Sequence, residues 1–309
     1  MNSTPTLADR LRDPSERTLG FLLLAPAFAL LALIVVYPIG KLLFNSFFDL
    51  RLSGGGGGAK FVGWENYALV LQDKAFWNAT RNTVLITLIT VPGALVVGMG
   101  LALLANMPFK RQWPVRLALL LPWALPLSFA GLIFAWFFHT EYGVVNDVVR
   151  RFSVLFGSVT PNEPTMWLLR PNWAFAAICL TIIWKTSSFM ALILLAGLQM
   201  IPKSLYEAAE VDGASRWQQF WQVTVPMLMP SIIVALIFRT ITALQTFDIP
   251  YTMTKGGPGE ATETLAMLIH KTTIEYLDVG YGSTLAVFMF ILSLVVTAVY
   301  LRRIGRNAG

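Results

Sequence analysis

The sequence predicts an all-α integral membrane protein with six transmembrane helices, as its composition, its long apolar runs and the placement of its charges indicate. Of 309 residues, 56% are hydrophobic and 13% are charged, whereas soluble domains average about 45–50% apolar and roughly 25% charged residues. The net charge of +6 comes from residues scattered near the ends of apolar runs. This placement is typical of the positive-inside bias of membrane proteins and argues against a nucleic-acid partner.

Six apolar runs are each long enough to cross a bilayer core of about 30 Å. The first is too long for the core of a signal peptide and no small-residue cleavage site follows it, so we expect it to be an uncleaved span. Pro122 and Pro126 in the third run, and Pro226 and Pro230 at the start of the fifth, predict kinks. The predicted spans are Leu19–Phe44, Asn82–Ala105, Leu117–Phe138, Trp173–Leu198, Met227–Phe247 and Gly280–Leu301.

The distribution of basic residues predicts the orientation of these spans. An even number of spans places both termini on one side, and the loops of that side carry 11 Lys and Arg in 65 residues, against 9 in 103 residues on the other. By the positive-inside rule the termini are predicted to be cytoplasmic. The expected organisation is a cytoplasmic segment 1–18, a membrane domain 19–301 with a cytoplasmic loop at 199–226, and a cytoplasmic tail 302–309.

Several segments outside the spans have recognisable local chemistry. The run Gly54–Gly58 predicts a flexible insertion. It is not a phosphate-binding loop, because Lys60 stands in the wrong position and no Ser or Thr follows it. Cys179 lies in an apolar run and is expected to be a small buried residue. His139 and His270 do not have the spacing of a metal site.

The segments that flank the membrane predict further local structure. Phe61–Tyr67 and Ala75–Trp77 are rich in aromatic residues, as expected at a membrane interface. A short helix is predicted within Thr140–Arg151. The glycines and proline of Lys255–Gly259 predict a tight turn after the fifth span.

The loop after the fourth span contains unusually dense helix-boundary signals. Ser204 with Glu207, and Ser215 with Gln218, have the spacing of capping boxes. Between them, Gly213 is expected to end the first helix in a left-handed conformation. The loop is therefore predicted to form two short helices that meet at a corner on Gly213.

Two charged residues lie well inside predicted spans, namely Lys185 in the fourth and Arg239 in the fifth. They are compatible with snorkelling or contact with a neighbouring subunit, and equally with a polar path for a substrate; charges inside a membrane mark function by default. The candidate substrate-path residues are Lys185, Ser188, Arg239 and Gln245. No Asp or Glu lies inside any predicted span, which argues against a proton-driven carrier.

Two other classes of membrane protein are disfavoured by the same spans. A secondary carrier is expected to show paired inverted repeats as well as membrane carboxylates. The predicted spans show neither feature. An intramembrane enzyme needs a nucleophile and a base within the spans. Ser283 has no convincing partner of this kind, since His270 precedes the last span and His139 follows the third.

The loop at 199–226 also carries a family resemblance. Glu207-Ala208-Ala209, three residues, Gly213, nine residues and then Val223-Thr224-Val225-Pro226 resemble the loop E-A-A-x3-G-x9-I-x-L-P of binding-protein-dependent ABC importer permeases, with Val in place of Ile and Leu. Leu23–Phe47, Phe61–Asn82 and Phe247–Pro258 resemble the carbohydrate branch, the maltose and glycerol-3-phosphate type. The large extra outer domain of the maltose-type first subunit is missing.

The resemblance implies the type I permease fold of ABC importers and a chain that does no chemistry itself. Glu207, Ala208, Ala209 and Gly213 are implied to couple it to a cytoplasmic ATPase; whether Glu207 caps its helix or contacts the ATPase stays open. The implied partners are a second, homologous permease chain, two ATPase subunits and an extracytoplasmic sugar-binding protein. ATP and Mg²⁺ are implied to bind to the ATPases, with no cofactor or metal on this chain. The implied location is the cytoplasmic membrane of a prokaryote.

Overall fold

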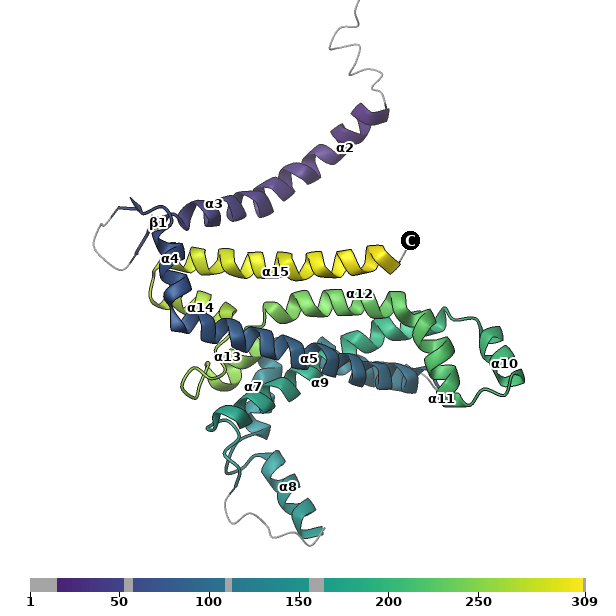
Figure 1. Cartoon of the computed structure of the whole chain (residues 1–309). Helices are drawn as coiled ribbons and strands as arrows, with labels where there is room; N and C mark the ends of the chain where they lie inside the picture. Colours follow the sequence, from purple (N-terminus) through teal and green to yellow (C-terminus); the bar gives the residue numbers. More distant parts are fainter. Residues whose placement is uncertain (1–15, 53–57, 109–112, 156–163, 308–309) are drawn as a thin grey trace, which may run out of the picture.

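The computed structural model describes residues 16–52, 58–108, 113–155 and 164–307. In these residues the fold is almost entirely helical, and the sheet they contain is one antiparallel pair of two-residue strands. The described residues include five segments long and apolar enough to cross a membrane: Leu19–Asn45, Lys74–Asn106, Pro171–Gln199, Arg216–Leu244 and Val279–Val299. Figure 1 shows the long helices α5, α12 and α15 with roughly parallel axes.

The first half of the chain contains the N-terminal helices, the strand pair and the helices up to α8. In chain order these elements are α2 (Glu16–Leu31), the π-helix η1 (Ala32–Val36), α3 (Tyr37–Asn45), β1 (Phe48–Asp49), β2 (Lys60–Phe61), α4 (Glu65–Gln72), α5 (Lys74–Asn106), α6 (Trp113–Ala124), α7 (Leu127–Phe137) and α8 (Val144–Leu155). The second half continues with α9 (Pro171–Gln199), α10 (Lys203–Val211), α11 (Arg216–Gln219), η2 (Phe220–Thr224), α12 (Val225–Leu244), α13 (Asp248–Thr254), α14 (Leu265–His270), η3 (Lys271–Glu275) and α15 (Val279–Asn307).

The third predicted span is wrong as a single helix. The segment forms two helices, α6 and α7, and the chain is extended at Pro126, where ψ is 143°. Proline has no N–H for the helical ladder and its ring clashes with the carbonyl four residues earlier, so the predicted kink at Pro126 is in fact a complete break of the helix. Pro122 is accommodated inside α6. The count of six spans stays a prediction.

The ends of the other predicted spans differ from the sequence-based bounds. The aromatic segment Ala75–Trp77, expected at an interface, is the first turn of α5, which Asp73 caps by accepting a hydrogen bond from the Ala75 amide at 2.8 Å. Helix α15 continues past Leu301 to Asn307.

The helix predicted within Thr140–Arg151 is confirmed as α8. The run at 54–58 lies almost wholly outside the described residues.

Helices α5 and α9 pack closely and form the centre of the fold, with α12 against both. Their approach requires Gly98, because a Cβ at this position would lie 2.7 Å from Cβ of Met190 and 2.9 Å from the carbonyl oxygen of Ser187. Cys179 of α9 is buried in an apolar cluster with Ile178 and Ile182, as predicted.

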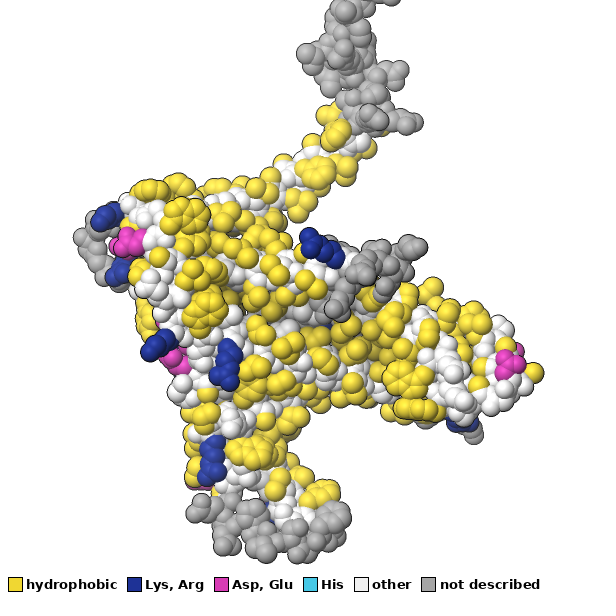
Figure 2. All heavy atoms as spheres, viewed as in Figure 1, with side chains coloured by type: hydrophobic (Ala, Val, Ile, Leu, Met, Phe, Trp, Pro, Cys, Tyr) yellow, Lys and Arg dark blue, Asp and Glu magenta, His cyan; other side chains and the backbone are white. Residues whose placement is uncertain are grey.

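The first helical segment, α2 to α3, lies apart from the central helices over much of its length (Figure 1). None of the most apolar window of Leu19–Asn45 is buried within the chain. Figure 2 shows hydrophobic side chains covering this segment and the middle of the visible face. Such a helix suits contact with lipid or with another apolar surface.

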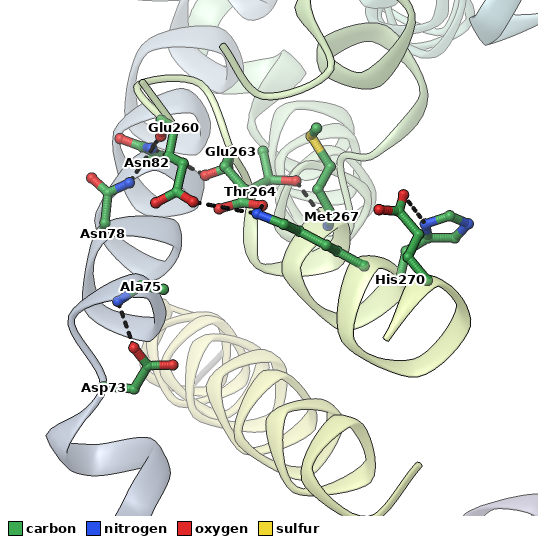
Figure 3. Close-up of polar contacts among 11 residues, drawn as sticks. Asp73, Ala75, Asn78, Asn82, Glu260, Glu263, Thr264, Met267 and His270 are labelled. Carbon is green, nitrogen blue, oxygen red and sulfur yellow. Dashed lines mark hydrogen bonds and ion pairs between the residues drawn. The ribbon is translucent and has the colours of Figure 1, made fainter. Parts of the chain in front are cut away.

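The segment Lys255–Thr264, here named the 255–264 loop, joins α13 to α14 and is fastened to α5. Lys255 and Gly256 adopt positive φ angles of 50° and 90°, which confirms the predicted turn. Asn82 donates to the carbonyl oxygens of Glu260 at 3.2 Å and Glu263 at 3.0 Å. Figure 3 shows Asn78 and Asn82 pointing from α5 at this segment.

A half-buried ion pair completes the attachment of the 255–264 loop. The ammonium of Lys271 lies 3.3 Å from Oε1 of both Glu260 and Glu263. Burial raises the pKa of Glu263, although Lys271 opposes the rise. Burial lowers the pKa of Lys271, but the Glu263 charge and the hydrogen bonds to both carboxylates outweigh it and bring that pKa to about 12. The lysine is thus charged at every physiological pH.

Candidate functional site

The loop at 199–226 forms two short helices, α10 and α11, that meet at a corner. Gly213 has φ of +76°, and the amide of Ala214 donates to the carbonyl of Ala209 at 2.9 Å across the end of α10. A left-handed residue just past the last helical turn is the usual glycine C-cap. The corner predicted at Gly213 is therefore confirmed.

One of the two predicted capping boxes is present and the other is wrong. Ser215 begins α11, with its hydroxyl accepting from the Gln218 amide at 3.4 Å and its own amide donating to Oε1 of Gln218 at 2.8 Å. Helix α10 instead begins at Lys203, after Pro202, with no side-chain cap. Pro202 itself occupies the N-cap position, with ψ of 133°, so the first helical residue is Lys203 and Ser204 lies inside the first turn. Glu207 is therefore not the N3 partner of an N-cap.

The motif residues of α10 are presented outward. Glu207, Ala208 and Gly213 are exposed, Ala209 is partly buried, and α10 buries none of its residues within the chain. Figure 1 shows α10 at one end of the molecule, and Figure 2 shows acidic side chains at that end. Within the loop, a hydrogen bond of 3.0 Å between the hydroxyls of Tyr206 and Thr224 joins α10 to η2.

A continuous helical run connects this corner to the interior. From Arg216 the chain passes through α11, the π-helical turn η2 and α12 to Leu244 without a break. Arg239 lies near the far end of the run and is 3% exposed. The run therefore links the exposed loop directly to a buried cation.

Arg239 and Lys185 line the same cavity, which has a volume of about 290 Å³. The cavity lies where α6 and α7 separate, with α9, α12 and the start of α13 around it. Its lining comprises Trp123, Leu127, Ile182, Lys185, Thr186, Phe189, Arg239, Thr242, Gln245, Thr246, Phe247, Asp248 and Ile249. This volume lies just below the range of about 300–1,000 Å³ for small-molecule sites.

The two cations are held by neutral groups. Nη2 of Arg239 donates to the Thr90 hydroxyl at 3.1 Å, and Nη1 donates to the Thr242 hydroxyl at 3.3 Å. Nζ of Lys185 donates to the carbonyl oxygen of Trp123 at 2.8 Å, at the end of α6. Both residues are buried within the chain, so neither snorkels to its surface.

The comparisons with known proteins identify the family. Residues 94–306 match the model of the binding-protein-dependent transport system inner membrane component. The chain belongs to this family. The matched segment contains the whole E-A-A loop and both cations, and the resemblance inferred from the motif is confirmed, as is a membrane protein with several spans.

Relatives and solved structures agree with this family over nearly the full chain. The chain is 66% identical over 293 residues to a sulfoquinovosyl glycerol transport system permease of Agrobacterium fabrum, covering 95% of this chain and 92% of the relative. It is 37% identical to a trehalose/maltose transport system permease of Thermococcus litoralis, covering 94% and 95%. A crystal structure of a bacterial alginate ABC transporter matches with a TM-score of 0.79 at 21% identity, covering 97% and 98%, and supports the fold.

The structure brings together most of the residues proposed for the substrate path in this family member. Lys185, Arg239 and Gln245 line one cavity, whereas Ser188 is buried on α9 and does not line it. Sequence reasoning missed Trp123, which contributes a backbone carbonyl, although Pro126 shortly after it signals a helix end where carbonyls lack partners. Asp248, which directly follows the predicted fifth span, also lines the cavity and was not among the candidate residues.

Proposed function

We propose that this chain is one permease subunit of an ATP-driven importer for a glycoside. Sequence identity of 66% over 95% of the chain to a sulfoquinovosyl glycerol permease is the strongest support. A second relative, at 37%, is named for trehalose and maltose. Both names concern glycosides, which is the substrate class that we assign to this chain.

The observation that carries the mechanism is the continuous helical run from the exposed corner to the cavity. A partner ATPase that grips α10 and moves on binding ATP displaces the Arg216 end of this run. Because the run is helical throughout, from α11 through η2 to α12, the displacement reaches Arg239 at the cavity. Alternation of the cavity between the two sides of the membrane then follows from a two-state rearrangement of packed helices.

The partners proposed are a second permease chain, two ATPase subunits that bind ATP and Mg²⁺, and an extracytoplasmic binding protein. The small size of the cavity in a single chain supports a site shared with a second permease. The uncovered apolar segment Leu19–Asn45 offers surface for such a chain or for lipid. This subunit then contributes the path, and the ATPases contribute the chemistry.

The test is reconstitution of the chain with the products of its neighbouring genes in proteoliposomes. We expect the binding protein loaded with a glycoside to stimulate ATP hydrolysis and ATP-dependent uptake. A panel of sulfoquinovosyl glycerol, trehalose and maltose samples the relatives' substrates. Uptake that requires an ion gradient, persists without ATP and is abolished by an ionophore would instead establish a secondary carrier.

A further inference from the structure

Arg239 is a buried cation with no carboxylate partner among the described residues. Its two hydrogen bonds go to the hydroxyls of Thr90 and Thr242, and its Nε is buried without a partner. A guanidinium offers five N–H donors in a fixed planar fork. Burial of such a charge is costly unless an opposite charge is supplied. The site is thus incomplete in the chain itself.

The rest of the cavity does not supply that charge. Lys185 is a second cation in the lining, and its ammonium donates to the Trp123 carbonyl, which leaves further N–H donors. Asp248 is the carboxylate of the lining, and its Oδ1 accepts a hydrogen bond of 2.9 Å from Ser128. No ion pair joins Asp248 to either cation among the described residues. The lining therefore carries two positive charges and one negative charge.

We propose that this cavity binds the anionic substituent of a glycoside, with Arg239 as the principal ligand and Lys185 as the second cation. The inference rests on the proposed function and specifies its substrate class. A neutral sugar hydroxyl would satisfy N–H donors but would leave the buried charge uncompensated. A sulfonate or carboxylate supplies several acceptor oxygens and the missing charge together, which a guanidinium fork matches well.

The geometry also assigns separate roles to the two cations. Arg239 is fixed from two sides by hydroxyls of α5 and α12, so its fork is already oriented when the ligand arrives. Lys185 is held by one bond to the end of α6 and has a flexible stem, so it can turn from the Trp123 carbonyl to a ligand oxygen. Arg239 is thus expected to determine charge selectivity, and Lys185 is expected to add to it.

The experiment compares matched glycosides that differ at one substituent. Uptake by the reconstituted importer is measured for sulfoquinovosyl glycerol, for glucuronosyl glycerol with a carboxylate at the same carbon, and for glucosyl glycerol with a hydroxyl there. Each glycoside is supplied at concentrations that saturate the binding protein, so that the permease step is compared. We expect the unmodified permease to prefer at least one anionic glycoside over the neutral one by tenfold or more.

Variants of the cavity residues test whether Arg239 and Lys185 cause the preference for anionic glycosides. Arg239→Gln is expected to lower anionic uptake at least tenfold and neutral uptake less than twofold, and Lys185→Met is expected to lower anionic uptake about threefold. Arg150→Gln, an exposed arginine of α8, is the matched control and should change neither. If Arg239→Gln does not assemble, Arg239→Lys keeps the charge without the fork and should reduce the preference at least threefold.

The outcomes separate this inference from the proposed function. Uptake of a glycoside with a charge preference that ignores Arg239 would overturn the anion site and leave the importer intact. An equal fall of anionic and neutral uptake in Arg239→Lys, with an unchanged melting temperature, would also overturn it. A preference for sulfonate over carboxylate, or the reverse, identifies which anion the cavity accepts. If none of these three glycosides is taken up but trehalose or maltose is, the anion site is overturned and the importer stands. Failure of trehalose and maltose as well overturns the proposed function and this inference with it.

Discussion

The 199–226 loop and the 255–264 loop are both polar and both rich in turns, but they are held in opposite ways. Figure 1 shows α10 of the first loop and α13 and α14, which flank the second, at opposite ends of the long helices. In the 255–264 loop Thr262, Glu263 and Thr264 are almost fully buried. In contrast, α10 buries none of its residues within the chain.

The difference lies in where the polar groups find partners. The polar groups of the 255–264 loop find their partners within the chain: Asn82 donates to the Glu263 carbonyl, and Lys271 pairs with the Glu263 carboxylate. This attachment fixes α13 beside the cavity. In the 199–226 loop, the Tyr206–Thr224 hydrogen bond and the backbone bonds of the corner join residues of the loop to one another, and they set the shape of the corner. A loop whose polar groups are bonded to the rest of the chain positions the neighbouring helices. A loop that is bonded only to itself and remains exposed is suited to dock a partner.

Gly213→Val is expected to have the largest effect on the coupling function of the 199–226 loop. A Cβ at Gly213 meets no atom within 4 Å, so space is available, but φ of +76° is strained for any branched residue. The strain of about 2 kcal/mol or more should distort the corner and reduce glycoside-stimulated ATP hydrolysis and uptake at least tenfold. The measurement is both activities in proteoliposomes with equal amounts of assembled complex.

Gly213→Asn is the matched control for that substitution. Asn tolerates the left-handed region much better than other side chains, so this variant should keep most of the uptake. Full uptake by Gly213→Val would show that the corner is not required for coupling, and the contrast between the two loops would lose its functional meaning.

The next effect tests the internally satisfied loop. Lys271→Met leaves Glu263 buried with no cation beside it, which is expected to destabilise the protein by about 2 kcal/mol because the lysine is itself partly exposed. Glu263→Gln should cost much less, because it removes a buried charge and leaves Lys271 beside Glu260. Melting temperatures of the two purified variants at pH 8 measure this asymmetry.

The pH dependence of Lys271→Met follows from the same carboxylate. Burial already raises the pKa of Glu263, and loss of Lys271 removes the interaction that lowers it. The charged form therefore costs stability above the raised pKa, and this cost is relieved as the pH falls and the carboxyl takes up a proton. The loss of melting temperature relative to the unmodified protein should be larger at pH 8 than at pH 5. A larger loss at pH 5 than at pH 8 would show that the stabilising effect of Lys271 does not come from its interaction with the Glu263 carboxylate.

The two loops also show how far sequence reasoning reaches. Gly213 and the Ser215 cap were predictable because both signals are local, and the motif spacing gave the family. The Ser204 cap was wrong because Pro202 began the helix earlier, so one local signal overrode another. The third span was wrong as a single helix because Pro126 broke it completely rather than bending it.

The cavity was predictable only in part because it depends on packing. Lys185 and Arg239 stood out as charges within apolar runs, which membrane proteins rarely tolerate without a role. That they line one cavity follows from the packing of α12 on α9, which no spacing in the sequence encodes. The group that binds Lys185 is the backbone carbonyl of Trp123. Every residue has such a carbonyl, so the residue type at position 123 could not predict this contact.

A several-fold effect is expected at Glu207 if the exposed loop docks a partner. Since Glu207 does not belong to a capping box, Glu207→Ala and Glu207→Gln should both lower coupled ATP hydrolysis while leaving the melting temperature unchanged. Glu210→Gln, an exposed acid of the same helix outside the matched motif, is the control. Normal coupling in Glu207→Gln together with a destabilised Glu207→Ala would instead return Glu207 to a structural role in its own helix.

The smallest expected effect is a difference in stability between variants of Ser204 and Ser215, each of which has a potential capping-box partner three residues on. Ser215→Ala removes an N-cap that the structure contains and should cost about 1 kcal/mol, whereas Ser204→Ala lies inside the first turn of α10 and should be nearly neutral. Because alanine is the best helix former, a slight gain in helix stability is possible only at Ser204. Circular dichroism and melting of both variants measure the pair, and equal losses at the two sites would restore the second capping box.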